Sequence, residues 1–218
     1  MKYTSKNIIV IFLLAALAYF SFLMLCIIWA YIPLHSDTCF LQLKQSYLHI
    51  TEWRIAFYTH VFTSMLVLFA GFTQFSESFN RKYKSFHRKL GYVYVINILL
   101  VTGPASLLMS FYANGGLSSK IAFVLLALLW MYFTGIGVYK AIKKDFVAHR
   151  IFMIRSFALT LSAISLRIWK VIFAVTTDIP PMGRYRIIAW LGWVLNLLIA
   201  EWIIYNAPSI PQKVEDTK

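Results

Sequence analysis

Histidine and arginine are the residues of this chain best suited to chemistry, and they occur together twice. His87 stands in 85-SFHRKLG-91 and His149 in 147-VAHRIFMIRSF-157. Each His-Arg pair lies where a short basic segment meets a long apolar run. Two imidazoles at one depth of a helical bundle can supply both axial nitrogens of a haem iron. The alternative is that both pairs only anchor helices at a membrane surface.

The composition is that of a membrane protein with several spans. Of 218 residues, 60% are hydrophobic and 13% are charged, against the ~25% charged that is typical of soluble domains. The mean hydropathy is +0.69. The net charge of +13 comes from 21 Lys and Arg against 8 Asp and Glu. These basic residues stand in short segments between apolar runs, which indicates membrane topology and not a nucleic-acid site.

Six apolar runs are long enough to cross a bilayer as helices, which takes about 20 residues each. They span about 8–30, 55–77, 88–111, 119–141, 149–174 and 185–206. The sequence therefore predicts an all-α, polytopic membrane protein with one domain over residues 1–218, including a tail at 207–218. Gly103-Pro104 in the third run is the only strong helix breaker among the six.

Basic residues are concentrated in every second loop. Those of the second loop are Arg81, Lys82, Lys84, Arg88 and Lys89, and those of the fourth are Lys140, Lys143, Lys144 and Arg150. The loop at 31–54 is nearly balanced in charge, and the loop at 112–120 holds one lysine. The positive-inside rule places the second and fourth loops in the cytoplasm. Both chain ends are then cytoplasmic as well.

The two helical hairpins with His-Arg pairs predict a four-helix core at about 55–174, flanked by the first and last helices. His87 and His149 then share a depth on parallel helices. Their diagonal separation is roughly 13 Å, because neighbouring helices pack ~8–10 Å apart. We therefore predict haem b, with these two histidines as axial ligands to its iron.

Arginines and glycines near these histidines suit the same cofactor. Arg88, Arg150 and Arg155 are predicted to meet the haem propionates, since arginine pairs bidentately with carboxylates; lipid headgroups are the alternative partners. Gly91 lies one turn after His87 on the same face and leaves room for a flat ring. The inner halves of neighbouring helices offer Gly71, Gly135 and Gly137 for the same purpose. Glycines also allow membrane helices to pack closely, which is the competing explanation.

Other ionisable residues at membrane depth are candidates for function, because charge inside a bilayer is costly. His60 and Arg167 lie in the outer parts of the second and fifth runs and are predicted to line a pocket. His60 has two alternatives, a hydrogen bond between helices and a proton relay. Glu201 and Arg155 lie at equal depth and are predicted to form a buried ion pair.

Several kinds of site have no support in the sequence. It has no nucleophile motif, phosphate-binding loop, dinucleotide fingerprint or HExxH zinc motif, so no catalytic residue is predicted. The two cysteines, Cys26 and Cys39, have no metal-ligand spacing and are expected to be free thiols, with a disulfide as the alternative.

An ordered set of residues between about 55 and 170 resembles a bacterial family of membrane proteins catalogued as domain of unknown function 2306. The set comprises His60, Gly71 to Phe75, Phe86 to Gly91, Tyr94, Gly115-Gly116, Trp130, His149-Arg150, Met153, Arg155-Ser156 and Arg167. This resemblance implies a multi-pass protein of a bacterial inner membrane, and no biochemical activity. At the level of the bundle, the chain also resembles transmembrane cytochromes b and ferric reductases. Those hold two haems on four histidines, whereas this core has His60, His87 and His149.

Three functions from different classes are therefore considered. The first is electron transfer by haem b to or from a quinone or another redox partner. The second is a small-ligand transporter or permease; a structural or assembly role in the membrane is the third reading. The sequence offers no support for nucleic acid as a partner and leaves any enzymatic activity undecided.

Overall fold

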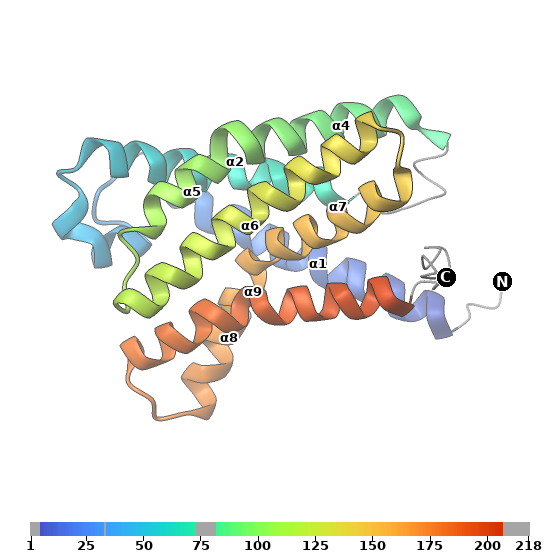
Figure 1. Ribbon diagram of the computed structural model, residues 1–218. Helices are drawn as coiled ribbons and strands as arrows, with labels where there is room; N and C mark the ends of the chain where they lie inside the picture. The colour runs from blue at the N-terminus through green and yellow to red at the C-terminus, as the bar shows by residue number, and fades with distance from the viewer. Residues whose placement is uncertain (1–4, 33, 73–81, 207–218) are drawn as a thin grey trace, which may run out of the picture.

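The computed structural model describes residues 5–32, 34–72 and 82–206, which form helices joined by turns (Figure 1). Four of its helices are continuous: α1 (Ser5–Trp29), α2 (Thr51–Phe72), α6 (Leu117–Ile142) and α9 (Pro181–Asn206). A short 3₁₀ helix, η1 (Cys39–Tyr47), lies between α1 and α2. The all-α prediction is confirmed for the described part of the chain. The end of the second run, predicted at 77, falls outside the described residues, as does the tail.

Two of the six runs are interrupted helices. The third run consists of α4 (Lys84–Ile96), a π-helical turn η2 (Asn97–Thr102) and α5 (Gly103–Ser110). The fifth consists of α7 (Phe146–Thr160) and α8 (Ser162–Thr176), separated at Leu161. Five stretches are long and apolar enough to cross a membrane: Thr51–Gly71, Lys84–Ser110, Leu117–Ile142, Phe146–Thr176 and Pro181–Asn206. Within α1, Ala18–Trp29 forms a shorter apolar helix.

The interruption of the third run has a local cause. Gly103 donates its N–H to the carbonyl of Ile98, five residues earlier, which is the hydrogen-bond step of a π-helix. A side chain at Gly103 would collide with that carbonyl, since an added Cβ would lie 2.1 Å from it. Pro104 lacks an N–H and is well placed at the start of α5. The Gly-Pro signal in the sequence thus marks a real break.

The interruption of the fifth run has no such signal, because Leu161 is flanked by neither glycine nor proline. The break is supported from α9, where the Asn196 amide donates to the carbonyl of Ala158 at 3.0 Å. Ser165, one turn beyond the break, donates to the Asn196 side-chain oxygen at 2.9 Å. The Asn196 side chain thereby supplies a hydrogen bond to a backbone carbonyl, which the hydrocarbon of a bilayer cannot do.

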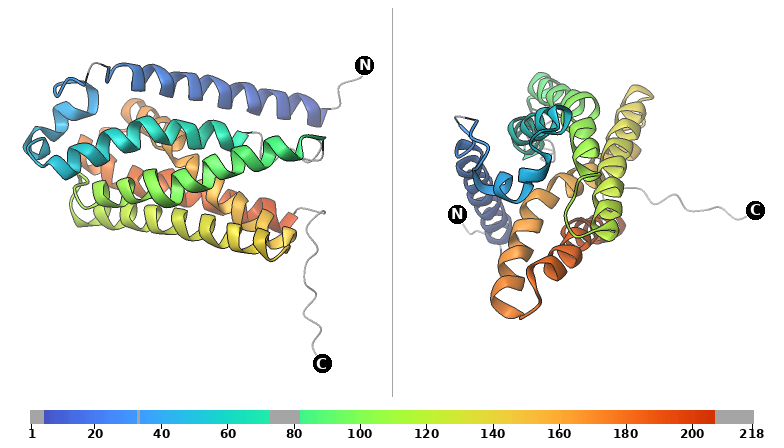
Figure 2. Two further views of the ribbon diagram at one scale, coloured as in Figure 1. Left: turned by 90° about the horizontal axis from the view of Figure 1, so that it is seen from above. Right: turned by 90° about the vertical axis from the view of Figure 1, so that its left-hand side faces the viewer.

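The helices are arranged with their connecting loops at two ends (Figure 1). The start of α1, the end of α9 and the turn between α6 and α7 lie at one end, which we call the basic end. The turns before α2, between α5 and α6, and between α8 and α9 lie at the other, which we call the cavity end. The left view of Figure 2 shows the same arrangement. The two ends of the described chain therefore lie on the same side, as the loop charges predict.

The core draws on one more helix than the expected four. Its main cluster of buried hydrophobic side chains is Val67, Ala70, Tyr94, Ile98, Trp130, Leu159 and Trp193. Trp193 belongs to α9, which packs against α6, α7 and α8. The core at 55–174 therefore extends to the sixth helix. In contrast, α1 packs mainly against α2, through Met24 and its neighbours.

Candidate ligand cavity and histidine pair

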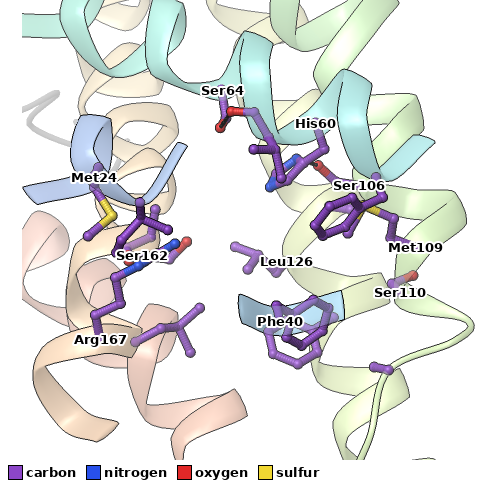
Figure 3. A pocket seen from close by; sticks show the side chains of 18 of the residues that line it. Met24, Phe40, His60, Ser64, Ser106, Met109, Ser110, Leu126, Ser162 and Arg167 are labelled. Atoms are coloured by element: carbon purple, nitrogen blue, oxygen red, sulfur yellow. Dashed lines mark hydrogen bonds between the residues drawn. The ribbon is translucent and has the colours of Figure 1, made fainter. Parts of the chain in front are cut away.

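A cavity of about 320 Å³ extends from the cavity end into the middle of the helices. Its walls come from α1, η1, α2, α5, α6, α7, α8 and α9, so it borders both interrupted runs. His60 and Arg167, which the sequence predicts as pocket residues, both line it. Figure 3 shows the two side chains extending into the cavity from different helices. The structure brings them together across 107 residues of sequence.

His60 is held by two hydroxyl groups of the third run. Its Nδ1 lies 2.8 Å from Ser106 Oγ and 3.2 Å from Thr102 Oγ1. Ser106 donates its own hydroxyl hydrogen to the Thr102 carbonyl at 2.6 Å. Because a serine has one hydrogen to give, a hydrogen bond between Ser106 and His60 in this arrangement requires the tautomer with hydrogen on Nδ1. The Nε2 atom of a neutral His60 then carries a lone pair.

Arg167 projects from α8, one and a half turns after the break. Its Nη1 donates to the carbonyl of Ala163 at 2.6 Å, on the same helix. Among the described residues, no Asp or Glu forms a salt bridge with it. Tyr31 and His60 lie close enough to interact with its charge. Arg167 is thus an exposed cation at membrane depth, on the cavity wall, and its Nε and Nη2 have no partner in the described part of the chain.

Lys44 contributes a third basic group at the mouth of the cavity. It is 2% exposed and belongs to η1, outside the membrane-spanning stretches. Its Nζ donates to the Tyr112 carbonyl and, at 2.7 Å, to Asn114 Oδ1, which fastens η1 to the turn after α5. The ammonium also lies 5.0 Å from the centre of the Tyr47 ring. Burial, with a smaller contribution from the charge of Lys120, lowers the pKa of Lys44 to about 8.

The rest of the lining is apolar with scattered hydroxyl groups. Aromatic walls are provided by Phe40, Trp53, Phe57, Phe123 and Trp130. No Asp or Glu lies among the described residues that line the cavity. Its chemistry is therefore that of an apolar chamber with positive charge and hydrogen-bond donors at a few points. Pockets of this kind fix the orientation of a small molecule through its polar groups.

The histidine pair lies at the basic end, away from this cavity. The carbonyl of Gly137 can only accept, so the Nδ1–H of His149 donates to it at 2.8 Å. Metal-binding histidines usually have their second nitrogen bonded in this way, which leaves Nε2 free for the metal. His87 Nδ1 is buried and has no hydrogen-bond partner among the residues that the structure describes. The two rings are close enough to interact electrostatically.

The space expected beside these histidines is occupied at two of the three predicted glycines, whereas at Gly135 an added Cβ would meet only Leu99, at 4.0 Å. At Gly71 an added Cβ would lie 2.2 Å from the Phe157 ring, and at Gly137 it would lie 2.8 Å from Met153 Sδ. The prediction that Gly71 and Gly137 leave room for a macrocycle is therefore wrong, because they allow close packing of α2 and α6 against α7. The nitrogen atoms suit a haem iron, whereas the packing around them suits it only if Phe157 and Met153 move.

The predicted propionate partners lie in different surroundings. Arg155 forms a bidentate ion pair with Glu201, through Nε at 2.6 Å and Nη2 at 2.8 Å. The predicted pairing is confirmed, although the side chains are 23% and 47% exposed and the pair is not buried. Arg88 is exposed at the start of α4, and Arg150 is half-buried in the first turn of α7. Gly91 is half-buried in α4, one turn after His87.

The sequence reading missed a buried network that joins α4, α6 and α7. The Tyr94 hydroxyl lies 2.9 Å from both Ser156 Oγ and Thr160 Oγ1. Trp130 donates its indole N–H to Thr160 at 3.0 Å. Tyr94, Trp130 and Ser156 all belong to the ordered set that carries the family resemblance, which was the available signal. This network fixes three core helices against one another, and two of its members, Trp130 and Thr160, line the cavity.

Cys26, on α1, is a free and exposed thiol. Among the described residues, no group of three or more His, Cys, Asp or Glu side chains is placed to hold a metal ion. The structure thus offers two candidate sites, the cavity with His60 and Arg167 and the pair formed by His87 and His149.

Comparison with known proteins identifies a family. The chain matches the family described as "Predicted membrane protein (DUF2306)" over residues 57–204. No curated protein and no solved structure matches the chain. The matched region contains both interrupted runs, the buried network, His60 and Arg167. Because the match covers more than half of the chain, this multi-pass membrane protein belongs to that family of predicted membrane proteins, domain of unknown function 2306.

Proposed function

We propose that this protein is a small-ligand permease whose binding site is the cavity at the cavity end. The observation that carries the proposal is the position of Arg167 without a carboxylate partner, on the wall of a chamber bounded by both interrupted helices. Maintaining such a cation at membrane depth costs stability, and ionisable residues placed this way usually serve a transported or bound species.

Interrupted helices support the same function. In many transporters, helices break near the middle of the bilayer and their freed backbone and side chains form the substrate site. Here the breaks at η2 and Leu161 both border the cavity, through Ser106 on one side and Ser162 on the other. Helix segments joined at such breaks can also tilt separately, which alternating access requires.

Access to the cavity from the two membrane faces tests this proposal. In a background with Cys26→Ser and Cys39→Ser, Ser162→Cys introduces a thiol on the cavity wall. Membrane-impermeant thiol reagents are then applied to each face of oriented proteoliposomes. Ser156→Cys is the matched control, because Ser156 is also buried and lies on the same run but does not line the cavity.

A permease predicts that Ser162→Cys reacts from both faces, while Ser156→Cys reacts from neither. Reaction from the cavity end alone would contradict transport. Reaction from neither face would contradict the cavity as a site that solutes enter.

A second candidate function is electron transfer by haem b to or from a quinone. It is favoured by the hydrogen bond from His149 Nδ1–H to Gly137, which leaves the other ring nitrogen for a metal, and by His87 Nδ1, which has no partner among the described residues. His87 and His149 would hold the iron, with Arg88 and Arg150 toward the propionates. Haem would supply one-electron chemistry, and these residues would orient it and set its potential.

Visible spectra of the purified protein test this candidate. Protein expressed with ample haem is recorded oxidised and after dithionite reduction. Sharp α and β bands that disappear in His87→Ala or His149→Ala support haem. A colourless protein contradicts it. The family resemblance also suggests a bacterial inner membrane, which fractionation of the native host would check.

A further inference from the structure

The two arginines of the fifth run differ in one respect that points to the ligand. Arg155 presents its Nε and Nη2 edge to the two oxygens of Glu201. Arg167, twelve residues later, uses only Nη1, on the Ala163 carbonyl. The same Nε and Nη2 edge of Arg167 has no partner in the part of the chain that the structure describes. The planar fork matches the geometry of a carboxylate.

Resting on the proposed function, we infer that the cavity takes a small monocarboxylate with an apolar body, whose carboxylate binds Arg167 as Glu201 binds Arg155. One guanidinium edge balances one negative charge. The Lys44 ammonium donates to Tyr112 and Asn114, which are uncharged, so its charge still attracts an anion from the cavity mouth, while Arg167 supplies the planar fork that a carboxylate matches.

The size and walls of the cavity set the rest of the ligand. A volume of about 320 Å³ corresponds to roughly ten waters at about 30 Å³ each, so the ligand has about ten non-hydrogen atoms. The aromatic lining favours an aromatic or short alkyl body. No lining Asp or Glu among the described residues repels a carboxylate.

Binding of benzoate tests the inference, with benzamide as an uncharged ligand of the same shape. The full chain is reconstituted in nanodiscs of zwitterionic lipid, and affinities are measured by calorimetry. Arg167→Gln removes the proposed partner. Lys170→Gln is the matched control, because it removes one positive charge from the same helix at an exposed position that does not line the cavity.

We expect benzoate to bind at least about ten-fold more tightly than benzamide, as charge-assisted bidentate hydrogen bonds do. Arg167→Gln should remove that difference, while Lys170→Gln should change the affinity for benzoate by less than about two-fold. Equal binding of benzoate and benzamide, or equal losses in both variants, would overturn the inference.

Anionic lipid is the other source of a negative group near Arg167, and a second arm separates it. Nanodiscs that contain phosphatidylglycerol should leave benzoate affinity nearly unchanged if the site is the interior cavity. An Arg167-dependent uptake of phosphatidylglycerol without benzoate binding would overturn the carboxylate ligand. If benzoate fails to bind while Ser162→Cys still reacts from both faces, the ligand class is wrong and the permease proposal stands. If Ser162→Cys is inaccessible, the permease proposal itself fails.

Discussion

Arg155 and Arg167 lie on one apolar run and have opposite surroundings. Arg155 has a carboxylate from α9 and stacks over Phe133 and Phe152, with its guanidinium 5.9 and 5.4 Å from the ring centres. Arg167 lies beyond the break at Leu161, against a cavity, with one backbone carbonyl as its acceptor. The chain thus completes one site itself and leaves the other to be completed by a ligand. This contrast separates a structural ion pair from a binding group.

The largest expected effect comes from giving Arg167 a carboxylate partner within the chain, as Glu201 is for Arg155. Ala163 lines the cavity four residues before Arg167, so Ala163→Glu places a carboxylate within reach of its guanidinium. We expect benzoate affinity to fall by at least about ten-fold, because the fork is then occupied. Calorimetry in nanodiscs measures this. Ala163→Gln, similar in size but uncharged, should lose less affinity; an equal loss would mean that bulk alone blocks the cavity.

The next largest effect is on the free energy of unfolding, and it should differ between the Arg155–Glu201 pair and Arg167. Glu201→Gln leaves the half-buried Arg155 without its partner, and we expect a loss of about 1–2 kcal/mol, between the values for exposed and buried ion pairs. Arg167→Gln removes a cation that has no such partner, so the free energy of unfolding should stay equal or rise. Equilibrium unfolding in detergent, followed by tryptophan fluorescence, compares them. A greater loss in Arg167→Gln than in Glu201→Gln would break the contrast between the two arginines.

The smallest effect is the dependence of anion binding on pH. The lowered pKa of Lys44, about 8, means that its ammonium loses its charge as pH rises through that value. Benzoate affinity should therefore be steady well below pH 8 and fall a few-fold as the pH rises through that value. Titrations from pH 6 to 10 measure the profile. Arginine keeps its charge over this range, so Lys44→Arg should flatten it; a fall that persists unchanged would assign the titration to another group.

Much of the fold could be predicted from the sequence, because bilayer thickness and loop charge act on composition alone. Local signals predict the six apolar runs, the position of both chain ends on the same side, and the break at Gly103-Pro104. The break at Leu161 does not, since it depends on Asn196 of another helix donating to Ala158. No property of residues 158–165 alone distinguishes them from an uninterrupted membrane helix.

The candidate sites divide in the same way. Depth in the bilayer correctly paired Arg155 with Glu201, because both lie near the same end of long helices. Depth could not show that Phe157 and Met153 fill the space beside Gly71 and Gly137, which depends on how the helices rotate. Lys44 could not be recognised from the sequence, because it lies in a loop of nearly balanced charge. It is buried because η1 folds over the cavity mouth.

The central claim is that a ligand carboxylate takes the place at Arg167 that Glu201 takes at Arg155. Solid-state NMR in bilayers tests it directly, with benzoate labelled at its carboxyl carbon with ¹³C and the protein labelled at arginine side chains with ¹⁵N. The account predicts carbon–nitrogen dephasing that corresponds to about 4 Å or less, as expected for a bidentate pair. The signal should disappear in Arg167→Gln and persist in Lys170→Gln. Bound benzoate without dephasing, or dephasing that survives in Arg167→Gln, would contradict the account.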